Sequence, residues 1–114
     1  MDAHTPESSP SGAIHGMPLA CLLGHGDARL LNIGDALTKL QAAQVCVIGV
    51  RSYEPEEAAL LTALGVRVFT MQDVRRDGMM NTFESALNIV RHAPGGYGIS
   101  IDLDAIDPVD APGV

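Results

Sequence analysis

Three carboxylates lie close together near the end of the sequence, at Asp102, Asp104 and Asp107, where an apolar run stops. The run over residues 99–103 predicts a β-strand, and because strand side chains alternate between faces, Asp102 and Asp104 should point the same way. Two carboxylates on one face repel each other unless a cation lies between them, and hard divalent metals prefer carboxylate oxygens. The spacing therefore predicts a divalent metal site. The alternative is a solvated strand end in which Asp107 prepares a turn before Pro108.

The first 16 residues form a second group of polar side chains. They are rich in Ser, Pro and Gly, which predicts a loop, and long loops in compact domains are usually functional or disordered. The loop carries four side chains that can bind a ligand or a proton, namely Asp2, His4, Ser11 and His15. For His15 the alternative is a histidine whose hydrogen bonds are satisfied beside the start of the next helix.

A third group of polar side chains is acidic. Glu54, Glu56 and Glu57 follow a continuous apolar run at residues 45–50, and Pro55 is suited to the first position of a helix. Acidic side chains at a turn from strand to helix can hold the cationic end, or the α-amino group, of a ligand. The alternative is the ordinary charge of a helix start, where the helix dipole favours anions.

Alternating strands and helices must position these three groups. Strands are predicted at residues 45–50, 66–69 and 99–103, and helices at residues 55–64, 70–76 and 81–91, with shorter helices at residues 17–23 and 35–41. This order predicts one domain of the α/β class with a parallel sheet. Ligands of such folds gather at the carboxyl ends of the strands, which is where the carboxylates and the acidic turn fall.

Composition limits the classes of function. The 114 residues are 46% hydrophobic but only 4% aromatic, so a single small core must be built from aliphatic side chains. The formal net charge of -7 argues against nucleic acid or an anionic membrane as a partner and favours cationic ligands. Cys21 and Cys46 lack C-x-x-C spacing and are predicted to be reduced, buried thiols. Neither a membrane span nor a signal peptide is recognisable, so we expect a cytoplasmic protein.

Three motifs, taken together, resemble the ureohydrolase family, and within it arginases more than agmatinases. Residues 11–19 resemble the S-G-x-x-H-G-x-P substrate loop of that family. Residues 48–57 are similar to its I-G-x-R-x-x-D/E-P-x-E turn, and residues 100–113 to its S-x-D-x-D-x-x-D-P-x-x-x-P-G metal motif. The motifs occur in the family's order at compatible spacing, so the resemblance covers essentially the whole chain.

The resemblance implies a three-layer α/β/α fold and hydrolysis of a guanidinium group, L-arginine to L-ornithine and urea, at a pair of Mn²⁺ ions that share an attacking hydroxide. By position, Asp2, Asp102 and Asp104 resemble the family's metal ligands. Asp2 and His15 resemble its catalytic residues, His15 as the histidine that passes a proton to the leaving amine. The positions similar to its substrate-binding residues are His4, Ser11, His15, Glu54 and Glu57. The resemblance also implies a homo-oligomer, a trimer or hexamer, for the complete protein.

The chain also departs from the family's pattern. Pro6 stands where a D-A-H-x-D metal motif begun at Asp2 would end. We therefore prefer the register in which Ser11 and His15 match the family's substrate loop and Asp2 matches the last Asp of the metal motif. In that register several of the family's metal ligands are absent, and we expect a single partial domain over residues 1–114, truncated at both ends and inactive by itself. Two alternatives remain open. One is an agmatinase or formimidoylglutamase of the same family, and the other is a non-catalytic domain that acts as a binding or assembly module.

Overall fold

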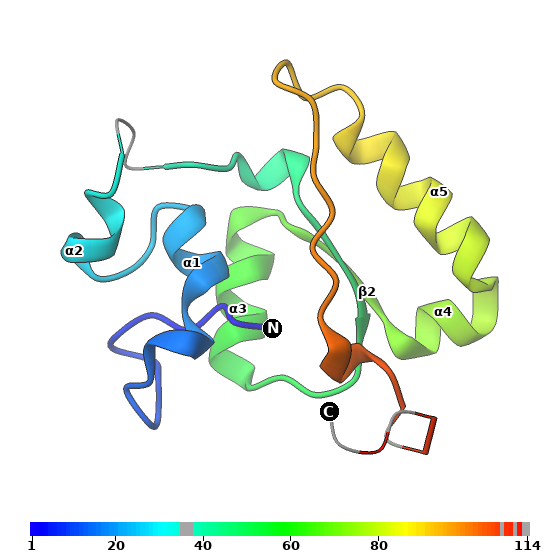
Figure 1. The fold of residues 1–114 in the computed structure, drawn as a ribbon, viewed down its shortest axis with the longest axis horizontal. Coiled ribbons are helices and arrows are strands. Elements are labelled where there is room, and N and C mark those ends of the chain that lie inside the picture. The colour runs from blue at the N-terminus through cyan, green and yellow to red at the C-terminus, as the bar shows by residue number, and fades with distance from the viewer. Residues whose placement is uncertain (35–37, 108, 111, 113–114) are drawn as a thin grey trace.

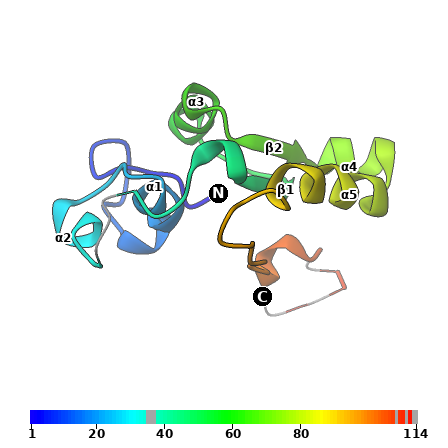
Figure 2. The ribbon, with the colours of Figure 1, turned by 90° about the horizontal axis from the view of Figure 1, so that it is seen from above.

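The centre of the molecule is a parallel pair of strands. The computed structural model describes residues 1–34, 38–107, 109–110 and 112. Strand β1 (Cys46–Val50) pairs with β2 (Arg67–Thr70), and helix α3 (Pro55–Leu64) connects them. Figures 1 and 2 show the strands between α3 and the later helices. The predicted α/β fold with a parallel sheet is therefore confirmed, and both strands start within one residue of their predicted positions.

Helix α3 begins and ends where its sequence dictates. Pro55 occupies the first helical position, and the backbone N–H of Glu54 donates to the Glu57 carboxylate at 3.1 Å. The helix ends at Gly65, whose φ of 76° is a left-handed conformation that glycine adopts without strain. These two signals explain why the predicted bounds, residues 55–64, are the observed ones.

Two further helices cover the other side of the strands (Figure 1). Helix α4 (Met71–Asp77) follows β2 directly, and Thr70 caps it by accepting from the Asp73 N–H at 3.2 Å. Gly78 separates α4 from α5 (Met79–Val90). The predicted helix at residues 81–91 thus starts two residues earlier, because the chain resumes its helix immediately after the glycine.

The N-terminal half contains shorter helical segments than the sheet region. Helix α1 (Pro18–Leu22) lies within its predicted bounds. Helix α2 (Ala28–Leu31) was not predicted, although Asp27 caps it by accepting from the Arg29 N–H at 2.8 Å. Of the helix predicted over residues 35–41, residues 35–37 lie outside the described residues and residues 38–41 are not helical.

The strand predicted at residues 99–103 is wrong. Residues 97–102 are neither helix nor strand, and Leu103–Ala105 is a turn of 3-10 helix. The physical reason is that a strand needs a neighbour for its backbone hydrogen bonds, and neither strand of the described sheet pairs with this segment. Its apolar side chains stay in solvent, with Ile99 62% and Ile101 79% exposed.

The hydrophobic core joins the N-terminal segment to α3. Its central cluster consists of Ala3, Leu23, Leu61 and Val66, with partly buried aliphatic side chains from both strands around them. The other buried apolar side chains are Met17, Ala20, Phe69, Val74 and Ala86. Leu61 is the largest fully buried side chain among the described residues. Within the described ranges, every helix is too short or too polar to cross a membrane.

Candidate functional site

A hollow of about 280 Å³ lies where the N-terminal loop meets the first turn of α3. The two segments are far apart in the sequence, and they are joined by a buried cluster that includes Ala3 and Leu61 and by the hydrogen bond from the Ala3 N–H to Glu57. The predicted site residues among those that line the hollow are Asp2, His4, Ser11, His15, Glu54 and Glu57. The structure thus brings every predicted substrate-binding residue to one place.

Glu57 is a buried lining residue of the hollow and joins the N-terminal loop to α3. Its side chain is buried, with the residue 4% exposed, and accepts from the backbone N–H groups of Ala3 and Glu54, both at 3.1 Å. The Met1 ammonium lies 3.3 Å from the same carboxylate. Burial by itself raises the pKa of Glu57, but the two N–H donors and the ammonium outweigh it, so the pKa lies below its usual value. Glu57 is therefore a structural anion as well as a lining residue.

His4 lies beside both glutamates and is itself buried, at 8% exposure. Its Nε2 is 3.5 Å from Glu54 Oε2 and 3.9 Å from Glu57 Oε2. Its Nδ1 is 3.2 Å from the Ser8 hydroxyl. The sequence did not predict Ser8 as a site residue. The signal that could have indicated it is its position four residues after His4 in the same loop.

The remaining residues of the N-terminal loop reach the hollow from its exposed side. Ser11 Oγ accepts from the Ala13 N–H at 3.2 Å, in a turn that Gly12 allows with its φ of 66°. His15 is exposed in the 3-10 turn Ile14–Gly16. Asp2 is also exposed, and its backbone has a φ of 56°, which few residues other than glycine adopt.

The C-terminal aspartates occupy a different place. Asp102 is exposed and does not line the hollow, and the side chain of Asp104 is outside what the structure describes. The argument that strand alternation puts Asp102 and Asp104 on one face no longer applies, because Leu103–Ala105 is helical. The segment is nevertheless tied to the turn after β1, where Arg51 Nη2 donates to the Ile106 carbonyl at 3.2 Å.

A metal centre requires several donor atoms that converge on one point. Mn²⁺ prefers several oxygen or imidazole donors at one point. Among the described side chains, three or more His, Cys, Asp or Glu residues do not converge on such a point. The described residues therefore do not complete a manganese site by themselves, and a site that uses Asp2 or Asp102 needs further donors.

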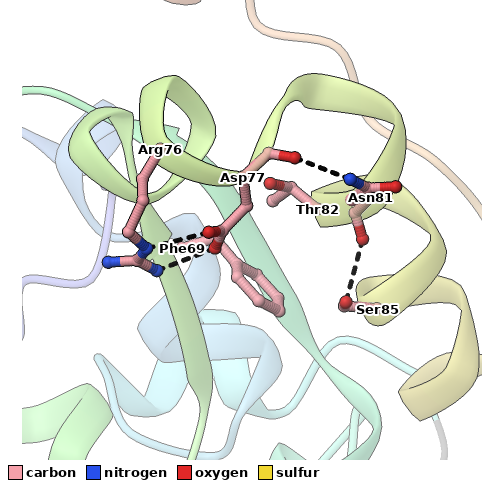
Figure 3. A pocket seen from close by; sticks show the side chains of 6 residues that line it. All are labelled: Phe69, Arg76, Asp77, Asn81, Thr82 and Ser85. Carbon is pink, nitrogen blue, oxygen red and sulfur yellow. Dashed lines mark hydrogen bonds and ion pairs between the residues drawn. The ribbon is translucent and has the colours of Figure 1, made fainter.

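A second hollow, of about 470 Å³, lies between β2, α4 and α5 (Figure 3). It contains none of the predicted site residues. Its polar groups already pair with one another: Arg76 contacts the carboxylates of Asp73 and Asp77, and Asn81 donates to the Asp77 carbonyl at 2.8 Å. Because these pairs neutralise its charge and use its donors, we assign this hollow no function.

Comparison with known proteins identifies the class to which this fold and hollow belong. The model of the Arginase family matches residues 1–114. A curated arginase of Brevibacillus brevis is 44% identical over 99% of this chain, and an arginase of Bacillus caldovelox is 42% identical over 99%. The chain therefore belongs to the arginase family, as its motifs indicated.

Solved structures agree with that assignment. The native structure of the Bacillus caldovelox arginase superposes on 100% of this chain with a TM-score of 0.91 and 41% identity. An arginase from Bacillus cereus matches 99% of the chain with a TM-score of 0.90 and 39% identity. The chain spans 38% of the length of each of the two curated relatives.

Proposed function

We propose that this chain forms part of an Mn²⁺-dependent enzyme that hydrolyses L-arginine to L-ornithine and urea. The names of its relatives support the reaction class. The observation that carries the proposal is the hollow in which an N-terminal loop with Ser11 and His15 faces the acidic residues Glu54 and Glu57. A substrate with a carboxylate and an amino group at one end needs both kinds of partner.

The hydroxyl of Ser11 is suited to the substrate's α-carboxylate. Its oxygen accepts from the Ala13 N–H, which leaves its own hydrogen to donate elsewhere. The carboxylates of Glu54 and Glu57 give the hollow a negative charge that attracts the α-amino group. The amino-acid end of arginine would therefore be oriented by a donor from the N-terminal loop and by anions from the start of α3.

His15 is proposed as the group that donates a proton to the leaving amine, a role for which histidine is the most frequent side chain. It lines the hollow from an exposed position that a substrate can reach. Asp2, Asp102 and Asp104 are proposed as carboxylate donors to Mn²⁺, together with donors outside the described residues. When bound, the metal would supply the activation of water for attack on the guanidinium carbon.

The wider setting of the enzyme is part of the same proposal. The complete protein is proposed to be a cytoplasmic homo-oligomer, a trimer or hexamer, acting in arginine metabolism. The net charge of -7 suits a cationic small molecule better than nucleic acid or a membrane surface. L-Arginine is the partner that this charge and the composition of the hollow favour.

Hydrolysis of three substrates tests the reaction, measured as urea for L-arginine and agmatine and as formamide for N-formimidoyl-L-glutamate. In the presence of Mn²⁺, we expect the protein, in the longest form that its gene encodes, to release urea from L-arginine faster than from agmatine, and to leave N-formimidoyl-L-glutamate intact. Faster release from agmatine would identify an agmatinase, and turnover of the formimidoyl substrate a formimidoylglutamase. Each of these results would overturn the arginase proposal.

Ser11→Ala gives a first mutational prediction. Losing one hydrogen bond to a charged group costs about 1.5–3 kcal/mol, so KM for L-arginine should rise on the order of tenfold or more. KM for agmatine should not change, because agmatine lacks the α-carboxylate. Ser52→Ala, an exposed serine outside the hollow, is the matched control. An equal rise in KM for both substrates would show that Ser11 acts on the loop and not on the carboxylate.

The exposed apolar side chains of the C-terminal segment favour the second candidate, a non-catalytic binding or assembly module. Metal content distinguishes the two. Stoichiometric Mn²⁺ that is lost in Asp102→Ala would support the enzyme, and a folded protein that takes up no Mn²⁺ at saturating concentration would support the module.

A further inference from the structure

We propose that Ser8 and His4 form a positioning pair that holds the Glu54 carboxylate toward the hollow, where the proposed function places the substrate's amino group. In this arrangement His4 contacts Glu54 and not the substrate. The inference deepens the proposed function and rests on it for the identity of the amino group. The contacts within the pair are independent of that identity.

The Ser8 hydroxyl fixes one edge of the His4 ring. Ser8 Oγ accepts from the Thr5 N–H at 2.9 Å and lies 3.2 Å from His4 Nδ1. The main chain of His4 is also held, because its N–H donates to the Gly16 carbonyl at 3.0 Å. Ring and backbone are thus both restrained, and the ring has one orientation relative to α3.

The opposite edge of the ring faces Glu54. His4 Nε2 is 3.5 Å from Glu54 Oε2, and a carboxylate can only accept a hydrogen bond. Nε2 must therefore carry a proton for the contact to be attractive. Ser8 is compatible with that arrangement, because its hydroxyl can donate to Nδ1 while the ring carries its proton on Nε2.

The side chains of His4, Glu54 and Glu57 differ in their exposure to solvent. His4 and Glu57 are buried, whereas the side chain of Glu54 is 51% exposed. Both Glu57 oxygens already accept backbone N–H groups, from Ala3 and Glu54. Glu54 is therefore the carboxylate of this group that a soluble cation reaches most easily.

Kinetics with two substrates test the pair on the complete protein. L-Arginine carries the α-amino group, and 5-guanidinopentanoate lacks it but keeps the carboxylate and the guanidinium. Loss of one hydrogen bond of ordinary strength in Ser8→Ala should raise KM for L-arginine on the order of three- to tenfold, with kcat nearly unchanged. KM for 5-guanidinopentanoate should stay the same, and Ser8→Thr should restore the value for L-arginine.

The matched control is Ser52→Ala, because Ser52 is exposed and does not line the hollow. It should leave both KM values unchanged. If Ser8→Ala raises KM for both substrates alike, or lowers only kcat, Ser8 supports the loop as a whole and the positioning proposal is wrong.

A spectroscopic measurement tests the pair without any activity. The ¹⁵N chemical shifts of the His4 imidazole, assigned by the loss of its signals in His4→Gln, should show the proton on Nε2. A ring protonated on Nδ1 alone would overturn the proposal. A protein that releases no urea from L-arginine would contradict the proposed function, and the spectrum would still decide the pair.

Discussion

Glu57 joins two parts of the chain that are 54 positions apart, by accepting the Ala3 N–H at 3.1 Å. Its carboxylate also accepts the Glu54 N–H at the start of α3. A single buried side chain therefore holds the N-terminal loop against the helix and completes the hollow. Removing its charge leaves the same N–H groups with a weaker acceptor.

Glu57→Gln should lower the free energy of unfolding at pH 7 by about 1–3 kcal/mol, because an amide is a weaker acceptor for buried N–H groups than a carboxylate. Urea denaturation followed by circular dichroism measures the change. Glu56→Gln, which alters an exposed neighbour, should change the free energy by less than about 0.5 kcal/mol. Equal effects of the two variants would contradict the role of Glu57.

The same variant should alter the pH dependence of stability. The pKa of Glu57 is lowered in the folded protein, so its stabilising effect is complete above its ordinary value of 4.5 and is lost as the pH falls through that value toward the folded pKa. The difference between Glu57→Gln and the unmodified protein should therefore shrink from pH 7 to pH 3. A constant difference across this range would show that the charge of Glu57 does not contribute.

A motif marks several of the proposed site residues in the sequence. The loop residues Ser11 and His15, and the turn residues Glu54 and Glu57, lie around one hollow, and their roles there stay predictions. Ser8 was missed because its role depends on the direction of the His4 ring, which is set by packing and not by residue type. The metal-ligand roles of the aspartates stay predictions.

At the scale of elements, capping residues decide where helices begin. Thr70 and Asp73 form a reciprocal pair at the start of α4, in which Asp73 Oδ2 accepts the Thr70 N–H at 2.8 Å and Thr70 Oγ1 accepts the Asp73 N–H at 3.2 Å. The hydrogen bonds from Thr70, helped by Arg76, keep the pKa of Asp73 below its usual value. The pair connects β2 directly to the helix without an intervening loop.

Thr70→Ala should lower the free energy of unfolding by about 1 kcal/mol, because it removes the cap and leaves an N–H of the first turn without its acceptor. Thermal unfolding at neutral pH measures the change. Thr62→Ala, at an exposed position inside α3, is the control and should have little effect or slightly stabilise, because alanine favours helices. A neutral Thr70→Ala would mean that β2 alone sets the start of α4.

Elements with local start and stop residues were predictable, and elements that depend on a distant partner were not. Pro55 and Gly65 bound α3 in the sequence, and the structure agrees. Residues 99–103 have the composition of a strand, but composition does not supply the neighbour that a strand requires. Helix α2 was missed because four residues are too few for a periodic pattern.

At the scale of the whole molecule, the surface retains apolar side chains that a compact domain usually buries. The largest exposures are in the C-terminal segment, where Ile101 is 79% exposed, and both strands of the described sheet have one unpaired edge. Unpaired edges and apolar patches promote association. We expect the 114-residue chain to associate as its concentration rises.

Ile101→Lys tests this expectation. The side chain makes little contact with the core, so the substitution should leave the free energy of unfolding nearly unchanged while its charge opposes association. Sedimentation velocity over a range of concentrations should show less association than for the unmodified chain. Gln72→Lys, at an exposed position on α4, controls for the added charge. A chain that stays monomeric at every concentration would refute the expectation.

The contact between Glu57 and Ala3 also has a consequence for the order of folding. The segment from β1 to α4 is continuous, so its contacts close short loops, whereas the docking of the N-terminal loop on α3 closes a long one. The short-range contacts should therefore form first, and the hollow should be assembled last. In a pulse-labelling hydrogen-exchange experiment, the amide of Ala3 should become protected after the amides of β2. The rate at which the Ala3 amide becomes protected would then measure how fast the hollow forms during folding.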